Sequence, residues 1–210
     1  MSTGDKKPQR FVVGEQNSAF FDVVAIASSA GGLRALNHLL SHLPRNFPVA
    51  IIVVQHLDRS HRSLLPEILA RGTALEVRPA IDGDRLRTGV VYIAPPNYHL
   101  LVKPGGVLSL SQTDLVNFVR PSADILFESV AASFDARAIA VILTGTGKDG
   151  ASGAEAVKAE GGVVIAQDKA SSEFFGMPGS AIMTGDVDFI LPLKDIADAL
   201  VKLVEDGELK

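Results

Sequence analysis

Residues 23–33 read VVAIASSAGGL, and this stretch decides the fold. An apolar run is followed by two serines and small residues, and Leu33 then opens a stripe of leucines at helical spacing. A near-continuous apolar strand that turns directly into an amphipathic helix is typical of a parallel sheet covered on both faces. The first prediction is therefore an α/β domain that begins near Phe21.

The same alternation of strand and helix continues along the chain. The expected strands are Asp22–Ala27, Val49–Gln55, Leu75–Pro79, Val90–Ala94, Ala138–Thr144, Val163–Ala166 and Val187–Leu191. The apolar stripes of the expected helices are Leu33/Leu36/Leu40/Leu43, Ile125/Leu126/Val130/Phe134 and Ile196/Leu200/Leu203/Val204. Tyr98–Val102 and Val107–Leu110 flank a Pro-Gly-Gly turn and predict a hairpin. Together these elements predict a doubly wound, mostly parallel sheet with helices on both faces and a β-hairpin insertion.

Length and composition narrow the class of protein. The 210 residues suit one domain, which we place at 21–207, after a flexible tail at 1–20. The net charge is −4 with scattered basic residues, and this argues against nucleic-acid binding. There is no cysteine, which excludes thiolate catalysis and fits a reducing compartment. Apolar runs such as Val49–Val54 are too short to cross a bilayer, so we expect a cytoplasmic protein without membrane insertion.

Ser29 is the candidate nucleophile. It stands between Ala27 and Gly31, close to the small-x-Ser-x-Gly turn of many hydrolases, in which small neighbours let a substrate carbonyl approach the backbone. The following helix would direct free N–H groups toward the site, where they favour a developing oxyanion. Ser28 is the competing nucleophile. Either serine could instead be a simple helix cap.

His56 ends the next apolar strand and is the candidate general base. A neutral imidazole there could accept the proton of a serine and return it to a leaving alkoxide. The alternative is a histidine with only local hydrogen bonds. His38 and His42, four residues apart on one expected helix, form a metal pair without an evident third ligand, so we predict no metal site.

Asp149 follows a third apolar strand, in a glycine-rich segment that could expose N–H groups to an anion. It could orient the histidine and stabilise its charged form. The same segment also matches the dinucleotide fingerprint, with glycines at 145, 147 and 150 and with Asp168 near the position of a ribose-binding acid. That alternative places the fingerprint late in the chain and leaves Ser29 and His56 without a role.

In a parallel sheet the three strand ends would face one edge, so Ser29, His56 and Asp149 form a candidate triad. Their order, Ser-His-Asp, differs from the Ser-Asp/Glu-His order of ordinary α/β-hydrolases. The pattern also resembles a known family, the CheB-type protein-glutamate methylesterase catalytic domain. The matching segments are Ile26–Gly32, Val54–His56, Val91–Pro95, Arg120–Phe127, Ile142–Gly150, Ile165–Asp168 and Phe175–Pro178.

This resemblance implies a function for each part of the site. It places the family's nucleophile, base and acid on Ser29, His56 and Asp149. It implies hydrolysis of glutamate methyl esters on the cytoplasmic helices of methyl-accepting chemoreceptors, without a cofactor, and in some members deamidation of glutamine. We expect the backbone N–H groups of Ala30 and Thr146 to bind the oxyanion.

Further expectations concern the rim of the site and its control. Arg120 and the Phe175–Pro178 loop, with Met177, are candidates to line the cleft, and a surface ion pair is the alternative for Arg120. The family commonly has methionine where this chain has Thr146, which leaves a backbone donor intact. Its members usually carry a preceding receiver domain, so we expect any such control to come from a separate protein. A non-catalytic receptor-binding module is the remaining alternative.

Overall fold

The computed structural model describes residues 19–56 and 63–209. Seven parallel strands form the main sheet in the order β3-β4-β2-β1-β7-β8-β9. They are β1 (Val23–Ser28), β2 (Ala50–Gln55), β3 (Glu76–Pro79), β4 (Val90–Ile93), β7 (Ala138–Ile142), β8 (Val163–Gln167) and β9 (Phe189–Leu191). β5 (His99–Lys103) and β6 (Val107–Ser111) form a separate antiparallel hairpin. The predicted sheet and hairpin insertion are confirmed.

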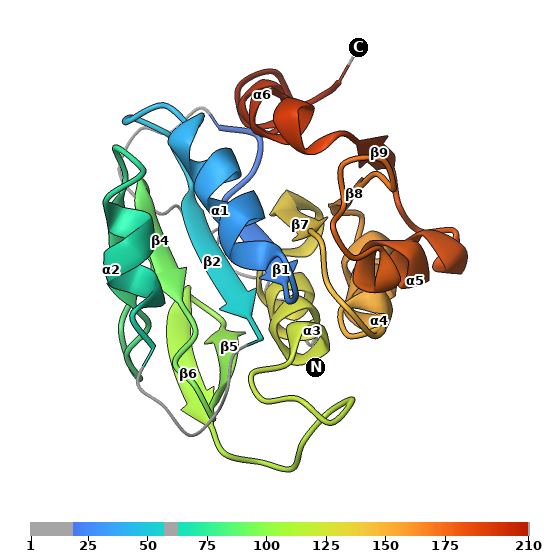
Figure 1. Ribbon diagram of the computed structural model, residues 1–210. Helices are drawn as coiled ribbons and strands as arrows, with labels where there is room; N and C mark the ends of the chain where they lie inside the picture. Colours follow the sequence, from blue (N-terminus) through green and yellow to red (C-terminus); the bar gives the residue numbers. More distant parts are fainter. Residues whose placement is uncertain (1–18, 57–62, 210) are drawn as a thin grey trace, which may run out of the picture.

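Helices cover both faces of the sheet (Figure 1). On one face lie α1 (Gly32–Ser41), α2 (Leu65–Ala70) and α6 (Leu193–Asp206). On the other lie the hairpin, α3 (Ala123–Phe134), α4 (Ala151–Ala159) and α5 (Gly176–Thr184), and the 3-10 turn η1 (Asp135–Arg137) leads from α3 into β7. The result is a three-layer arrangement with a hydrophobic core on each side of the sheet.

The two cores explain why the strands read as continuous apolar runs. In β1, Val23, Ala25 and Ala27 face the core beneath α3, whereas Val24 and Ile26 face the core beneath α1. Successive side chains of a strand point to opposite faces, so a strand covered on both faces needs an apolar residue at every position.

The sheet changes winding direction between β1 and β7, which are neighbours. The helix after β1 covers one face and the helix after β7 covers the other (Figure 1). The loops that follow these strands therefore diverge and leave a crevice at the carboxyl edge, which is where ligands bind in sheets of this kind.

The expected strands agree with the observed bounds to within two residues. The helices agree less well. Leu33, expected in the buried stripe of α1, is 40% exposed. The expected Phe175–Pro178 loop is wrong, because Gly176 begins α5. The six-residue helix α2 was not expected, since it is too short to show a periodic pattern.

The expected tail at 1–20 overlaps the described residues only at positions 19 and 20. Residues 1–18 lie outside the described residues. Phe20 donates a backbone hydrogen bond to Val204 of α6 (3.0 Å), and Arg137 donates to the carbonyl oxygen of Ala19 (3.0 Å). Residues 19 and 20 are thus bonded to the folded domain.

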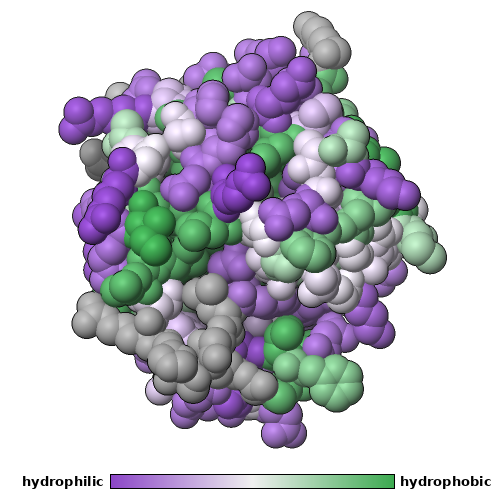
Figure 2. All heavy atoms as spheres, in the orientation of Figure 1, coloured by the Kyte–Doolittle hydropathy of each residue, from purple (hydrophilic) through white to green (hydrophobic). Residues whose placement is uncertain are grey.

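The surface carries mixed polar and apolar side chains (Figure 2). An apolar patch lies over α1 and α2 in this view. Leu33 of α1, Ile68 of α2 and Leu64 just before α2 have exposed side chains. Within 19–56 and 63–209, no helix has the length and hydropathy needed to span a bilayer.

Candidate active site

Ser29 is the first residue after β1, at the crevice between β1 and β7. Its backbone is held from two sides: its N–H donates to the carbonyl oxygen of Thr144 (3.0 Å), and its carbonyl oxygen accepts from Gly32 (2.9 Å) and Gln55 (2.8 Å). Gly31, with φ of 76°, adopts the left-handed conformation that turns the chain into α1. Ser29 itself is partly exposed, as a nucleophile must be.

Ser28, the competing nucleophile, is differently placed. Its side chain is fully buried and its hydroxyl donates to Oε1 of Gln55 (2.6 Å). The amide of the same Gln55 donates to the carbonyl oxygens of Ser29 and His56. Ser28 therefore belongs to a structural network that joins the ends of β1 and β2, and it does not face a substrate.

Gly145 lets the loop after β7 approach Ser29 closely. A Cβ atom at Gly145 would lie 2.8 Å from Cβ of Ser29 and 2.3 Å from Sδ of Met177, so no side chain fits there. Met177 is fully buried. It supports this loop from within the core, instead of lining an open cleft as the sequence suggested.

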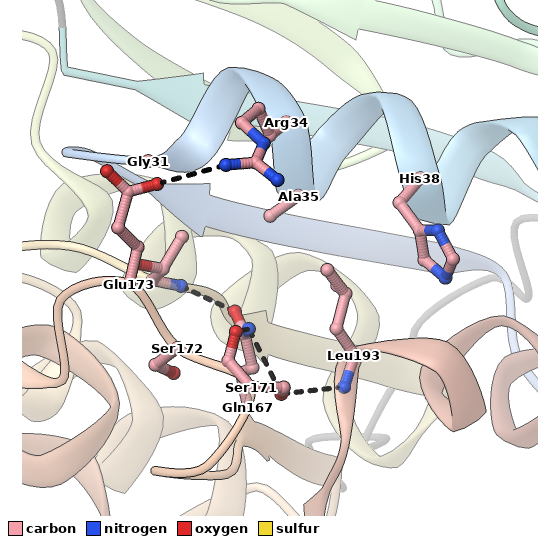
Figure 3. Close-up of a pocket in the computed structure, with 10 residues that line it drawn as sticks. Gly31, Arg34, Ala35, His38, Gln167, Ser171, Ser172, Glu173 and Leu193 are labelled. Atoms are coloured by element: carbon pink, nitrogen blue, oxygen red, sulfur yellow. Dashed lines mark hydrogen bonds and ion pairs between the residues drawn. The ribbon is translucent and has the colours of Figure 1, made fainter.

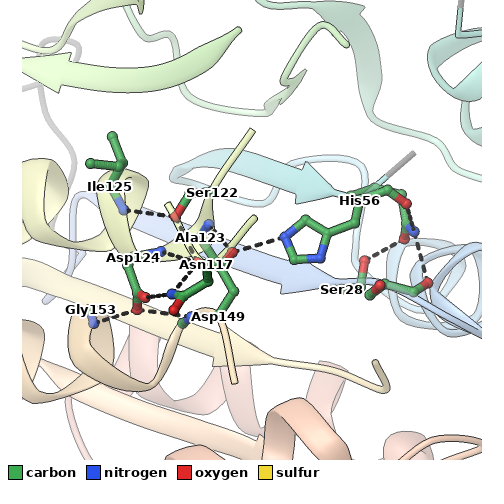
Figure 4. A network of polar contacts seen from close by, with 12 residues as sticks. Ser28, His56, Asn117, Ser122, Ala123, Asp124, Ile125, Asp149 and Gly153 are labelled. Carbon is green, nitrogen blue, oxygen red and sulfur yellow. Dashed lines mark hydrogen bonds and ion pairs between the residues drawn. The ribbon is translucent and has the colours of Figure 1, made fainter. Parts of the chain in front are cut away.

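His56 and Asp149 are joined by a hydrogen bond of 2.8 Å between Nε2 and Oδ2 (Figure 4). The His56 side chain is 11% exposed and that of Asp149 is 3% exposed. A proton on Nε2 makes Nδ1 the free acceptor of the ring. In Figure 4, Nδ1 points away from Asp149, toward the end of β1 where Ser28 is drawn. Among the described residues, no hydrogen bond joins the Ser29 hydroxyl to His56.

Asp149 is fixed by the start of α3. Its carboxylate accepts from the Ser122 hydroxyl (2.6 Å) and from the backbone N–H groups of Ala123 (2.5 Å) and Asp124 (3.4 Å). Burial alone would raise the pKa of Asp149, but hydrogen bonds from His56, Ser122 and Ala123 outweigh it and lower the pKa below its usual value. The carboxylate is therefore ionised at neutral pH and can stabilise a charged imidazole.

Asp124 is a second buried carboxylate beside Asp149. One of its oxygens accepts from the N–H groups of Gly150 and Gly153 (both 2.9 Å), and the other from Asn117 (2.7 Å). Burial, together with the charge of Asp149, raises the pKa of Asp124 although the bonds from Gly153 and Gly150 act in the opposite sense. Asp124 thus occupies the N–H groups at the start of α4.

This occupancy argues against the dinucleotide alternative. A pyrophosphate would need the free N–H groups of the helix that follows the glycine-rich segment. In this chain a protein carboxylate already accepts from them. Asp168, the expected ribose partner, instead accepts from the backbone N–H (2.9 Å) and the hydroxyl (2.6 Å) of Ser171.

The predicted oxyanion donors lie on the two loops that meet at Ser29. Within the described part of the chain, the N–H groups of Ala30 and Thr146 have no hydrogen-bond acceptor. The Thr146 loop is held by the start of α5, because Gly145 donates to Phe174 (2.9 Å) and accepts from Met177 (2.9 Å). The arrangement leaves two donors available near Ser29, the predicted nucleophile.

Arg120 braces the loop before α3. Its guanidinium donates to Oδ1 of Asn97 (2.7 and 3.2 Å) and to the carbonyl oxygens of Gln112 (2.9 Å) and Thr113 (2.6 Å). These contacts give it a structural role in the loop that leads to Asn117, Ser122 and Asp124.

Sequence reasoning missed four residues of this site: Gln55, Asn117, Ser122 and Asp124. Ser122 carried a signal, because a serine before an apolar stripe, with an acidic residue in the first turn, marks the start of a helix. The other three carried none, since a hydrogen bond to a residue seven or more positions away leaves no periodic pattern in the sequence.

A groove of about 400 Å³ lies beside the turn between β1 and α1, which carries Ser29 and Gly31 (Figure 3). Gly31 and Thr144 line it, with polar side chains from α1 and from the segment after β8. Arg34 and Glu173 form an ion pair across it at 4.0 Å, and Gln167 donates to the carbonyl oxygen of Ser171. Polar and apolar residues both line the groove, and Gly31 lies two residues after Ser29, but His56 and Asp149 do not line it.

The histidine pair on α1 has local contacts. The rings of His38 and His42 lie 4.4 Å apart, and Nδ1 of His42 contacts the carbonyl oxygen of His38 at 2.7 Å. Across residues 19–56 and 63–209, no group of three or more His, Asp or Glu side chains is placed to hold a metal ion.

Comparison with known proteins identifies the family of this chain. Residues 24–200 match the family model described as CheB methylesterase. A Moorella thermoacetica protein named protein-glutamate methylesterase/protein-glutamine glutaminase is 43% identical, over 87% of this chain and 44% of its own length. A Leptospira interrogans relative is 37% identical, over 89% of this chain and 97% of its own length. The chain thus spans about half of one relative and nearly all of the other.

A solved structure gives the same result. The crystal structure of the Thermotoga maritima CheB methylesterase catalytic domain superimposes with a TM-score of 0.85 at 43% identity. The match covers 88% of this chain and 99% of that domain. By sequence and by fold, the chain belongs to the CheB methylesterase family.

Proposed function

We propose that this chain is a protein-glutamate methylesterase, a serine hydrolase that converts glutamate methyl esters to glutamate and methanol. The observation that carries the proposal is the His56–Asp149 hydrogen bond of 2.8 Å, at the same sheet edge as the partly exposed Ser29. The relatives from Moorella thermoacetica and Thermotoga maritima bear the name of this activity. The proposed substrates are esterified glutamates on the cytoplasmic helices of methyl-accepting chemoreceptors.

The first half of the reaction forms an acyl-enzyme. Oγ of Ser29 attacks the ester carbonyl while Nδ1 of His56 takes its proton, because Nε2 is engaged by Asp149. The N–H groups of Ala30 and Thr146 bind the oxyanion; loss of one such donor costs about 3 kcal/mol of transition-state stabilisation. The imidazolium then protonates the methoxide, which leaves as methanol.

The second half regenerates the enzyme. Water attacks the acyl carbon and gives a proton to Nδ1 of His56, which returns it to Oγ of Ser29 as glutamate leaves. The ionised Asp149 stabilises the imidazolium in both halves. These steps need no group beyond the chain itself and water.

The same site supports a second reaction, deamidation of glutamine. An amide differs from the ester in its leaving group: the imidazolium protonates the amide nitrogen, the C–N bond breaks and ammonia leaves, where the ester would release methanol. The relatives named above carry the name protein-glutamine glutaminase as well. We propose it as a side activity of the same three residues.

The proposal includes the setting of the enzyme. We assign residues 21–207 to the catalytic domain, place the protein in the cytoplasm, and propose a separate receiver protein as its regulator. The competing function is a receptor-binding module of the same fold that does not turn over. Asp149 favours the enzyme, because its buried carboxylate accepts a hydrogen bond from His56 and has a lowered pKa.

The test is methanol release from a methylated chemoreceptor fragment by wild-type protein and by Ser29→Ala. We expect release by the wild type and at least a 1,000-fold slower rate for the variant, on the scale of a lost nucleophile. A fluorophosphonate probe should label Ser29 in the wild type. Absence of both methanol release and labelling would establish the binding module instead.

A further inference from the structure

A tight turn at Asn117 and Phe118 lies beside the proposed triad. The backbones of Val116 and Val119 pair across it, with nitrogen-to-oxygen distances of 3.0 and 3.3 Å. Both central residues have positive φ, 50° and 65°. The left-handed region is tolerated by asparagine but is unusual for a bulky residue such as phenylalanine.

Among residues 19–56 and 63–209, Phe118 gains no packing that would offset this conformation. Its side chain is 90% exposed, the highest value among the exposed large hydrophobic residues described. Strained backbone persists where the surrounding structure imposes it, and it concentrates at functional sites. Phe118 therefore combines an unfavourable backbone with an unburied aromatic ring.

The turn is tied directly to Asp124 and to Asp149, the proposed catalytic acid. Nδ2 of Asn117 donates to Oδ2 of Asp124 (2.7 Å) and lies 3.4 Å from Oδ1 of Asp149 (Figure 4). The other oxygen of Asp149 binds His56. Arg120 holds the same loop from the opposite end. Phe118 is thus displayed one residue from a side chain that contacts the triad, on a loop with fixed anchors.

Single exposed apolar residues are common and need no explanation by themselves. Met183, which is 88% exposed on α5, is such a residue, because its backbone is that of an ordinary helix. Phe118 differs in its strained backbone and in its connection to Asp149. Those two features, and not exposure, carry the inference.

We propose that Phe118 is a specificity-determining residue, whose ring packs on an apolar side chain of the substrate beside the reacting glutamate. The inference rests on the proposed function and adds a requirement on the substrate. On a helical substrate, the residue three or four positions away shares the face of the ester. Burial of an aromatic ring against it stabilises binding. The enzyme therefore prefers esters with an apolar neighbour on that face.

The test uses two helical peptides, each with one glutamate methyl ester. One peptide has leucine four residues from the ester and the other has serine there. We expect wild-type kcat/KM for methanol release to favour the leucine peptide by about tenfold, the size of one buried apolar contact. Phe118→Ser should bring this ratio close to one, whereas the control Met183→Ser should leave it at the wild-type value.

A second variant separates specificity from folding. Phe118→Gly removes the strain, because glycine adopts positive φ freely, so its Tm should equal or exceed that of the wild type while the ratio still falls close to one. A wild-type ratio near one, or an unchanged ratio in Phe118→Ser, would overturn the inference alone. So would an equal fall for both peptides, since the turn would then act only through Asn117 and Asp149. No release by the wild type from either peptide or from methylated receptor would overturn the proposed function as well.

Discussion

Asp124 and Asp149 each cap the helix that begins beside the other. Asp149, just before α4, accepts from Ser122 and from the first N–H groups of α3. Asp124, in the first turn of α3, accepts from Gly150 and Gly153 at the start of α4. The helices can approach closely enough for this exchange because Gly153 has no side chain. A Cβ there would lie 2.6 Å from Cβ of Phe127. The position of the proposed catalytic acid is therefore set by the packing of two helices.

The exchange predicts that Asp124 stabilises the fold. Asp124→Ala leaves the N–H groups of Gly150 and Gly153 buried without an acceptor, so we expect a loss of about 1–3 kcal/mol in the free energy of unfolding. Asp124→Asn keeps one carbonyl oxygen and should lose less. Urea unfolding of both variants at pH 7 measures this. Equal stability of Asp124→Ala and wild type would show that water replaces the carboxylate at no cost.

The lowered pKa of Asp149 predicts a pH-dependent contribution to stability. Because the folded-state pKa lies below the unfolded one, the stabilisation is complete above the ordinary carboxyl value of about 4 and is lost as pH falls through the folded-state pKa. Wild type should exceed Asp149→Asn by about 1–3 kcal/mol at pH 7. Urea unfolding at pH 7, 5 and 3 should show the difference shrinking only below about pH 4. A difference that does not vary with pH would contradict the assignment.

The two serines should respond oppositely to a serine-reactive probe. Ser29→Ala should abolish labelling and methanol release, because the partly exposed hydroxyl is the proposed nucleophile. Ser28→Ala should still be labelled, although loss of its buried bond to Gln55 should destabilise the fold by about 1 kcal/mol. Mass spectrometry of the labelled peptide locates the site. Labelling at residue 28 in the wild type would reverse the assignment.

Gly145→Ala should disturb the nucleophile itself. The new Cβ would meet Sδ of Met177 and Cβ of Ser29, so we expect a loss of about 1–3 kcal/mol in stability and of at least tenfold in kcat. The double variant Gly145→Ala/Met177→Ala removes the clash with sulfur but keeps the clash with Ser29. The double variant should therefore recover some of the stability lost by the single variant Gly145→Ala, because it removes the overpacking against sulfur. Its kcat should stay low. Thermal unfolding and methanol release measure the two effects.

A double variant that regains full activity would contradict a role for the close approach between the two loops. It would mean that the substitution acts only through Met177, which is buried beneath the loop. A double variant with low kcat would support the view that Gly145 is needed because Ser29 lies against it.

The apolar strands and the chemistry at their ends could be predicted from sequence. The continuous apolar run of β1 indicates a sheet covered on both faces, because only that environment favours apolar residues at every position. Ser29, His56 and Asp149 each follow such a strand, and the carboxyl ends of parallel strands meet at one edge. Local pattern was sufficient for both predictions.

Tertiary structure alone decided how those side chains are held. The sequence favours Ser29 over Ser28 only through the small residues at 27 and 31. In the structure, the buried hydrogen bond of Ser28 to Gln55, which is 27 residues away, separates the two serines. The sequence predicts a loop where α5 begins, because this helix shows little periodicity of its own. In the structure its first turn is held by a hydrogen bond to Gly145. The partners of Asp149 come from α3 and from the 116–119 turn, more than twenty residues earlier in the chain. A hydrogen bond between distant residues leaves no periodic trace in either segment. The apolar pattern of the sequence therefore predicted the sheet and the chemical groups at its edge, and three-dimensional packing determined which of these groups are buried and which are partly exposed.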